Sequence, residues 1–493
     1  MLTATSSYKT SKYGLALGVA FAALAIMAIA AYAVRSLPLS FAAAAMLILM
    51  APFVYGVLPK TRQWILGAML FFYPLNVDET RMLQPSPGGA DGFALDMVDI
   101  LMVMLFVITL IRSSRSKQLG ELQFFPSLML PSLAMLVMMA ISLVNAQDLL
   151  WSGFDLFNMA KTILFFFLLA NNIRSPRDLH IVLLSLFAGV VVQTSIAAAV
   201  NINPQVMEML KSIKLGGSEQ VEIPTSSVSD FFRSGGTLGN ANHLGRYYGL
   251  VLPIAMALAI TKTHVAMGRV AALISAIGLL GVINTLSRSA WLGIAFSFMM
   301  TLPLILIYRH FTLRSFVKIA TAALFGLVVL VILWEPIYER LTRPDNGSAN
   351  TRITTAKVAL RIIEDHPFIG CGINNYGAML DEYWIAEDVF TRKAAVHNNY
   401  LLYAAETGIL GLTAYVWLLL AVAVRLRKAM ASPVRYYSVV AIGIMTAYGA
   451  YLLEALSDKS YKENYMLLIT FWALLAITEA IIRLSSERSL QES

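Results

Sequence analysis

The chain has 493 residues, of which 58% are hydrophobic and only 13% are charged. A soluble domain carries roughly 25% charged residues, so this composition excludes an ordinary soluble enzyme and points to the lipid bilayer as solvent. The net charge of +8 comes from basic clusters between apolar runs, which favours an orientation signal in a membrane over nucleic-acid binding. A single cysteine, Cys371, excludes an intramolecular disulfide.

Apolar runs of roughly 20 residues, the length of helix that crosses a bilayer, recur along the whole chain. The first run follows Lys9 and Lys12, but it is too long for the core of a signal peptide, and we expect it to be retained as a span. One run is short and another contains Lys161, so the sequence predicts an all-α polytopic membrane protein with about 12–14 transmembrane helices. The candidate spans are residues 13–34, 36–58, 63–76, 93–111, 124–144, 155–171, 179–200, 242–260, 269–286, 289–308, 317–334, 397–424, 436–455 and 464–482.

The basic residues between the spans are distributed unevenly. Connections on the side of the N-terminus hold most of them, whereas the short connections on the other side hold few, among them Arg288, Lys459 and Lys462. Because basic residues collect on the cytoplasmic side, this asymmetry predicts that both termini lie inside. It also places the two long polar loops, residues 201–236 and 335–396, on the outer face.

The second of these loops is much longer than an ordinary connection. Loops of more than about 15 residues are uncommon unless they are functional or disordered. Aromatic and aliphatic side chains recur in residues 335–396 at helical spacing, so we expect short helices that lie on the membrane surface. Such a segment would cover the end of the next span, and residues 335–396 are called the lid below.

The lid is followed by His397, at the start of the next predicted span. If a helix begins there, Leu401, Ala404, Gly408 and Gly411 share one of its faces, where the two glycines allow another helix or a lipid-like ligand to approach closely. A histidine at the outer end of this face is suited to act as a general base near neutral pH. The alternative is an interfacial histidine that only caps the helix.

Several ionisable residues fall within or near the predicted spans. Glu406 lies further inside the helix that follows His397. Because an ionised group at that depth is costly and is usually paired, we expect a structural partner for it, such as a buried arginine or an amide, rather than a catalytic role. A transporter would use Asp96, Asp99 and Lys161 as coupling sites, but these residues are few and lie near span ends.

Several arginines are expected at the outer level of the membrane. Guanidinium groups bind phosphate oxygens in a bidentate manner, so arginines that converge there would suit a pyrophosphate ligand. The alternative is that loop arginines pair with acidic residues of the lid itself. Arg288 lies in a short turn without an acidic neighbour in sequence, which favours a binding role. The other candidates are Arg246, just inside a span, and Arg340, Arg343, Arg352 and Arg361 in the lid.

The stretch from Gly235 to His243 opens another span and is rich in glycine and asparagine. Turn geometry and helix capping are the expected roles of Asn240 and Asn242, and donation to a sugar or a phosphate is the alternative. The sequence contains no Walker motif, no His-Glu-x-x-His zinc motif and no Asp-x-Asp motif. We therefore expect a reaction that needs no metal or other cofactor and uses an already activated donor.

Four motifs together resemble the O-antigen ligase/polymerase superfamily. His397-Asn398, followed by nine residues and then by Gly408-x-x-Gly411, is similar to a signature of bacterial O-antigen ligases. The other three motifs occur in the expected order and, with the first, cover about residues 235–411. They are Gly236-Thr237-x-x-Asn240-x-Asn242, Thr285-x-Ser287-Arg288 and Asp365-His366-Pro367-x-x-Gly370-x-Gly372.

The resemblance implies a GT-C-like, inverting glycosyltransferase of the bacterial inner membrane, with an active site that faces the periplasm and with cytoplasmic termini. It implies a glycan on undecaprenyl pyrophosphate as donor, His397 as the base for the acceptor hydroxyl, and Arg288 and Arg352 as a clamp on the pyrophosphate. Asn398, the second residue of the signature, is grouped with the substrate-binding residues. The remaining lid arginines fit the same role as Arg352.

The resemblance leaves the acceptor open. A ligase transfers the glycan to lipid A-core or, in relatives, to a protein, whereas a polymerase transfers it to another lipid-linked glycan. The spacing between Asn398 and Gly408 favours a ligase, which we put first, and the long outer loops favour a polymerase. A secondary transporter is a further alternative, and it would place His397 and Arg288 along a path at the membrane midplane instead of together beneath the lid.

The predicted organisation has three regions. Residues 1–234 form an N-terminal transmembrane bundle with the outer loop 201–236. Residues 235–424 form the ligase-like core with the lid, and residues 425–493 form the last transmembrane helices and a cytoplasmic tail. Membrane lipids are the expected surroundings, and no nucleic-acid partner is expected.

Overall fold

The structure is a computed structural model, and it describes most of the chain beyond residue 59. The predicted spans at residues 13–34 and 36–58 lie outside the described residues. The described residues are 60–75, 78–81, 92–115, 122–203, 205–212, 227–228, 231–232, 234–261, 263, 265–332, 334–342, 348–385, 395–459, 462 and 464–492.

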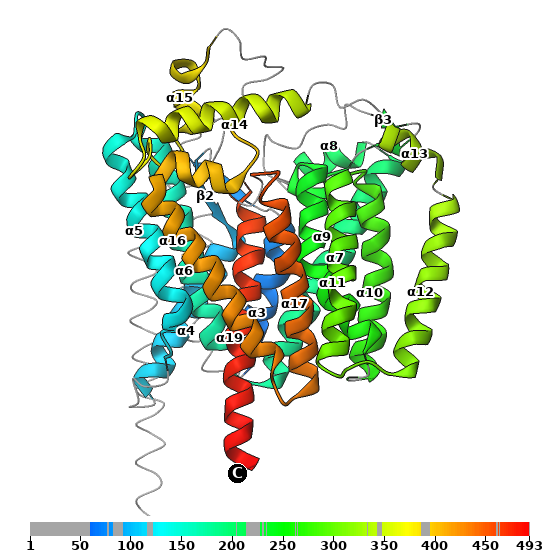
Figure 1. The fold of residues 1–493 in the computed structure, drawn as a ribbon. Coiled ribbons are helices and arrows are strands. Elements are labelled where there is room, and N and C mark those ends of the chain that lie inside the picture. Colours follow the sequence, from blue (N-terminus) through cyan, green and yellow to red (C-terminus); the bar gives the residue numbers. More distant parts are fainter. Residues whose placement is uncertain are drawn as a thin grey trace, which may run out of the picture.

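Long helices dominate the described part of the chain and stand side by side in a bundle (Figure 1). Each is built from a predominantly apolar run, and a helix satisfies its backbone hydrogen bonds internally, as a segment within lipid must. The long helices are α4 (Met97–Arg115), α5 (Pro126–Ser142), α6 (Leu149–Asn172), α7 (Pro176–Ile202), α9 (Ala241–Ile260), α10 (Val265–Asn284), α11 (Arg288–Ile307), α12 (Leu313–Ile332), α16 (Asn399–Met430), α17 (Arg435–Glu454) and α19 (Tyr465–Glu492).

Nine helices within the described residues are long and apolar enough to cross a membrane. They are α5, α6, α7, α9, α10, α11, α16, α17 and α19. A helix also coincides with each of the other predicted spans from residue 63 onward. The prediction of an all-α polytopic membrane protein is therefore confirmed.

The N-terminal described spans differ in detail from the prediction. Helix α3 (Thr61–Phe72) is shorter than the predicted span 63–76, because Pro74 lies in the 3₁₀ turn η1 (Tyr73–Leu75) that follows it. The predicted span 93–111 begins instead with strand β2 (Phe93–Asp96), which pairs antiparallel with β1 (Asp78–Arg81) in the register Asp78 to Asp96. This hairpin, a small addition to the helical bundle, delays the start of α4 to Met97.

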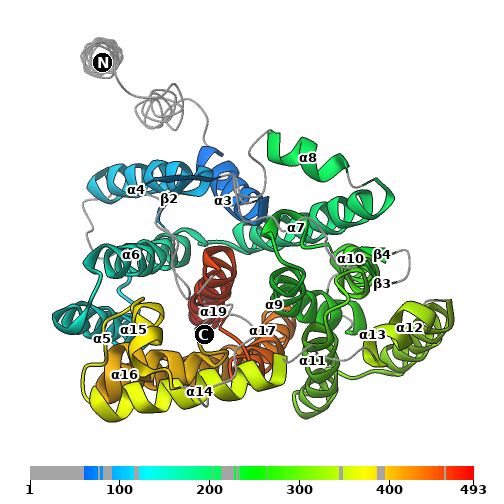
Figure 2. The ribbon, with the colours of Figure 1, turned by 90° about the horizontal axis from the view of Figure 1, so that it is seen from above.

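Helix α9 lies in the interior of the bundle and packs against α10, α11 and α17 (Figure 2). Small residues let these helices approach closely. A Cβ atom on Gly443 of α17 would overlap Cα of Ile254 on α9, and one on Gly278 of α10 would overlap the Leu252 side chain. Because lipid tails are as apolar as leucine, such close packing is what holds helices together in a membrane.

The lid forms three helices at one end of the bundle, which is called the lid end below. They are α13 (Trp334–Thr342), α14 (Ser348–Asp365) and α15 (Tyr376–Tyr383). Figures 1 and 2 show α14 lying across this end of the bundle, over α16, while the C-terminus lies at the opposite end. The other long loop contributes α8 (Gln205–Ser212), β3 (Ser227–Val228), β4 (Phe231–Phe232) and η4 (Gly236–Leu238) at the same end.

Helix α16 departs from the expected continuous helix. It begins at Asn399 rather than at His397, and Gly408 interrupts it with φ 67° and ψ −173°. The prediction that His397, Gly408 and Gly411 share one helical face is therefore wrong, because the break rotates the second part of α16 against the first. Only a glycine adopts this backbone conformation without strain.

The lid occupies the break. Backbone N–H groups of Cys371 and Gly372 donate to the carbonyls of Ala405 and Glu406 at 2.9 and 3.0 Å, and that of Ile409 donates to Pro367 at 2.8 Å. A Cβ atom on Gly408 or Gly370 would overlap the opposite backbone. The lid backbone thus packs directly against Gly408 at the break. The paired segments, residues 367–372 of the lid and 405–410 of α16, are called the clasp below.

Candidate active site

His397 lies at the lid end, in the segment that leads from the lid into α16. It precedes the N-cap residue Asn398, whose Oδ1 accepts a hydrogen bond from the Leu401 N–H at 3.0 Å. The His397 side chain is 28% exposed, and its Nδ1 lies 4.0 Å from Oδ2 of Asp458. The imidazole is therefore accessible to a bound molecule and has a carboxylate beside it.

Asp458 connects His397 to a buried arginine. Its Oδ2 atom also lies 2.7 Å from Nη2 of Arg246, and Nε of Arg246 lies 3.8 Å from Oε2 of Glu454. Arg246 is 1% exposed, and a guanidinium is tolerated at such a place where carboxylates offset its charge. The structure thus joins His397 and Arg246, both selected from the sequence, through an aspartate that the sequence analysis did not select.

Glycines make room for the Glu454 carboxylate between α9, α11 and α17. A Cβ atom on Gly293 of α11 would overlap Oε1 of Glu454, and one on Gly249 of α9 would lie 3.9 Å from the same oxygen. Gly249 follows Arg246 by three residues and therefore lies on the same side of α9. The carboxylate is held where it faces the arginine.

Hydrogen bonds link the starts of α9, α11 and α19 into one polar layer at the lid end. Ser287, the N-cap residue of α11, donates from Oγ to Oδ1 of Asn242 at 2.8 Å. Asn464, just before α19, places Nδ2 3.1 Å from Nδ1 of His243. Arg288 is the first residue of α11 and is partly buried, so it belongs to this layer. Helix N-termini carry partial positive charge, and together with an arginine they favour an anion.

The asparagines selected from the sequence have local structural contacts. Asn240 caps α9, accepting from the Asn242 N–H at 2.8 Å, as the capping interpretation predicted. Asn398 caps α16 and also donates from Nδ2 to the Leu456 carbonyl at 3.0 Å. A role of Asn240, Asn242 or Asn398 in binding substrate stays a prediction.

Two of the lid arginines, Arg352 and Arg361, lie on α14. Arg361 donates from Nη1 to the Tyr383 carbonyl at 3.0 Å, which ties α14 to the end of α15. Arg352 lies in the first turns of α14 with an exposed side chain. Arg343 lies outside the described residues, and the Arg340 side chain is not described.

Glu406 is completely buried in α16 and forms an ion pair. Its Oε2 lies 2.6 Å from Nζ of Lys462, which also lies 3.0 Å from Oδ2 of Asp155 on α6. The partner is therefore a lysine rather than the expected arginine or amide. Gly411 lies past the break, where a Cβ atom would overlap the Thr407 side chain.

The stretch from the end of α17 to the start of α19 contains ionisable residues that were not selected from the sequence. Glu454, Asp458, Lys459 and Lys462 follow one another within this short stretch, and all four are buried. Lys459 and Lys462 were assigned to a short outer connection, and the structure shows that both are buried in it. Four such ionisable residues within positions 454–462, between two apolar runs, were the available signal.

The arrangement places an imidazole beside a carboxylate and, at the same end of the bundle, an arginine at a helix N-terminus. This combination suits removal of a proton from a hydroxyl near a phosphate-bearing ligand. Among the described residues, no group of three or more His, Cys, Asp and Glu side chains is arranged to hold a metal ion. The absence of a metal requirement stays an expectation.

Comparison with known families gives one match. Residues 272–416 match the family model described as O-Antigen ligase. This matched segment is called the O-antigen ligase domain below. The resemblance to the O-antigen ligase/polymerase superfamily, predicted from four motifs, is confirmed by this match. No curated protein matches the chain significantly.

The O-antigen ligase domain begins within α10 and ends beyond the break in α16. It contains Arg288, the lid and His397. Arg246, Asp458 and Lys462 lie outside the matched segment, although Asp458 lies 4.0 Å from His397 and pairs with Arg246. The polar layer is thus assembled from the domain and from the helices on either side of it in sequence.

Proposed function

We propose that this protein is an inverting glycosyltransferase that moves a glycan from a lipid-linked pyrophosphate, undecaprenyl pyrophosphate in a bacterial inner membrane, to an acceptor hydroxyl. The reaction takes place at the lid end, which faces the periplasm. The observation that carries the proposal is the position of His397 in an O-antigen ligase domain. It is partly exposed, and its Nδ1 lies 4.0 Å from Asp458, which pairs with Arg246 of α9.

His397 acts as the general base. The acceptor oxygen attacks the anomeric carbon of the donor sugar, its proton passes to the imidazole, and the bond from that carbon to the pyrophosphate oxygen breaks. A negative charge from Asp458 stabilises the imidazolium that results, and Arg246 fixes the position of that carboxylate. General base catalysis by a positioned histidine contributes roughly 10²–10⁴-fold to a rate.

Arg288 and Arg352 bind the leaving pyrophosphate. Arg288 is favoured because it starts α11 in the polar layer, where the helix N-terminus adds to its charge. Arg352 is exposed on α14 and would meet the donor from the lid side. Arg246 and Arg361 contribute indirectly, because Arg246 pairs with Asp458 and Arg361 joins α14 to α15.

The acceptor distinguishes a ligase from a polymerase, and we put a ligase that uses lipid A-core first. A secondary transporter remains the alternative of another class. Lys161, about halfway along α6 and 2.9 Å from Asp99, is the kind of pair that a transporter would use. The O-antigen ligase domain favours the glycosyltransferase.

The test uses purified protein in lipid with an undecaprenyl pyrophosphate-linked glycan, offered either lipid A-core or only more donor. Glycan on lipid A-core supports a ligase, and a ladder of lengthened lipid-linked glycan supports a polymerase. His397→Ala is expected to abolish transfer while donor binding is kept, and His180→Ala, which removes a histidine stacked on Tyr436, is the matched control. Unchanged transfer by His397→Ala would refute the base.

A further inference from the structure

Lys462 joins three segments of the bundle that are far apart in sequence. Its Nζ atom lies 2.6 Å from Oε2 of Glu406 on α16 and 3.0 Å from Oδ2 of Asp155 on α6. All three side chains are buried, with 4%, 1% and 7% exposure for the lysine, the glutamate and the aspartate. Burial alone would lower the pKa of Lys462, but the two carboxylates raise it above its usual range, so the lysine is charged.

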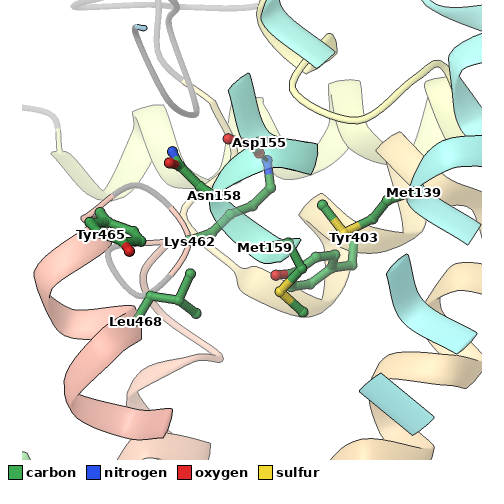
Figure 3. Close-up of a pocket in the computed structure, with 8 residues that line it drawn as sticks. All are labelled: Met139, Asp155, Asn158, Met159, Tyr403, Lys462, Tyr465 and Leu468. Carbon is green, nitrogen blue, oxygen red and sulfur yellow. Dashed lines mark ion pairs between the residues drawn. The ribbon is translucent and has the colours of Figure 1, made fainter. Parts of the chain in front are cut away.

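A small cavity adjoins this cluster. Its volume is about 30 Å³, enough for one or two water molecules, and Asn158, Tyr403 and Tyr465 help to line it. Figure 3 shows the Lys462 side chain extending toward Asp155 beside this space. The cavity is too small for a sugar, so the cluster is not a substrate subsite.

Glu406 is also a member of the clasp. Its backbone carbonyl accepts the hydrogen bond from Gly372, and its carboxylate Oε1 lies 3.4 Å from the backbone N of Tyr376, at the start of α15. One residue therefore holds the lid through its backbone and Lys462 through its side chain. Any displacement of the Glu406 carboxylate changes the turn of α16 on which the lid rests.

Lys462 is also close in sequence to the proposed active site. It follows Asp458 by four residues, in the same connection between α17 and α19. The start of α16 is fixed to this connection as well, because the Asn399 N–H donates to the Ala455 carbonyl at 2.9 Å. These contacts thus connect the clasp, the start of α16 and the stretch that contains Asp458.

We propose that Lys462 is a positioning residue that, by binding Glu406, holds the clasp closed and fixes the lid relative to His397. Lys462 does not touch the reacting atoms. Removal of its charge leaves two buried carboxylates without their cation, and such groups move toward water or take up protons. The first part of the structure to yield is the clasp, because the carboxylate and the lid contact belong to the same residue.

Cys371 reports directly on the clasp. It is the single cysteine of the chain, it is completely buried, and its backbone N–H donates to the Ala405 carbonyl. Burial raises the pKa of its thiol, so little of the reactive thiolate is present at neutral pH. A thiol reagent therefore reaches Cys371 when the clasp opens, and the labelling rate measures that opening.

A second buried lysine provides the matched control. Lys161 pairs with Asp99 at 2.9 Å and is 5% exposed, and its Nζ lies 4.1 Å from the centre of the Tyr465 ring. Lys161→Met removes a buried lysine whose ion pair is with the partly buried Asp99, whereas Lys462→Met removes the cation that pairs with Glu406 and Asp155. Lys462→Arg keeps the charge in a slightly larger side chain that the adjacent cavity accommodates.

The experiment measures maleimide labelling of Cys371 in the full-length protein in lipid, together with the thermal unfolding midpoint. We expect about tenfold faster labelling in Lys462→Met than in Lys161→Met, with Lys462→Arg close to wild type. Glu406→Gln tests the same link if Lys462→Met does not accumulate. Equal labelling in Lys462→Met and Lys161→Met would overturn the proposal.

The positioning role in catalysis rests on the proposed function, whereas the labelling readout does not. In a transfer assay, Lys462→Met should lose about tenfold in kcat with donor binding nearly unchanged, and Lys462→Arg should restore kcat. Absence of transfer by the wild-type protein would refute the proposed function alone. Faster labelling with unchanged kcat would refute the link between the clasp and the active site.

Discussion

The carboxylate of Asp458 forms an ion pair with the guanidinium of Arg246 at 2.7 Å, inside a bundle of membrane helices. The same oxygen faces His397 at 4.0 Å. The aspartate therefore has two neighbours that compete for its charge, a permanent cation and a group that becomes a cation only when it takes up a proton. This relationship makes the site testable at single positions.

Asp458→Asn keeps the shape of the side chain and removes its charge. Because the imidazolium then lacks its carboxylate, we expect kcat/KM for glycan transfer to fall about tenfold or more. Glu364→Gln, at an exposed lid position outside the four motifs, is the control and should leave transfer unchanged. A wild-type rate in Asp458→Asn would show that the carboxylate does not assist His397.

Alanine substitutions at two glycines around Glu454 are expected to change the stability of the protein differently. Alanine at Gly293 would overlap the carboxylate, so we expect a loss of about 1–3 kcal/mol in stability. Alanine at Gly249 meets the same oxygen at 3.9 Å and should be neutral or stabilising, since alanine is the better helix former. Thermal unfolding in detergent compares them, and equal midpoints would contradict the close packing.

Gly408→Ala tests the break in α16. An alanine there adopts a left-handed conformation that costs roughly 1–2 kcal/mol and also overlaps the lid backbone at Phe368. We expect a lower unfolding midpoint and faster labelling of Cys371. Gly268→Ala in α10, where the nearest atom lies 3.6 Å away, serves as the control. Unaltered labelling in Gly408→Ala would mean that the lid does not depend on the break.

Asn398 allows a structural role to be separated from substrate binding. Asn398→Ala removes the N-cap of α16 and should cost about 1 kcal/mol, whereas Asn398→Asp keeps the capping acceptor, loses only the exposed hydrogen bond to the Leu456 carbonyl and should retain most of the stability. If the aspartate variant is stable but fails to bind donor, the amide contacts substrate. If it is stable and binds donor normally, capping accounts for Asn398.

Arg288 and Arg361 should differ in their effect on donor affinity. Arg288→Gln removes a charge from the polar layer and is expected to weaken donor binding about 10–100-fold. Arg361→Gln removes the hydrogen bond to the Tyr383 carbonyl and should loosen the lid with little effect on donor binding. Equal losses in both variants, measured with a donor lacking an acceptor, would reject this division of roles.

Much of the helical architecture follows from local pattern. An apolar run of sufficient length forms a helix in lipid because no other local structure satisfies its backbone, so the spans from residue 124 onward could be predicted closely. Helical spacing in the lid likewise predicted its helices. The break at Gly408 could not be predicted, because an isolated glycine in a helical run also occurs in unbroken helices.

The sequence by itself determined that this is a helical membrane protein with a long lid ending at His397, and its motifs indicated the family. Only the tertiary structure decided that Asp458 faces His397 and that Lys462 reaches Glu406. The physical reason is that a buried charge is stabilised by a partner from another segment. The sequence shows which residues are ionisable and where each lies along its helix, but the packing of distant helices decides which of them meet.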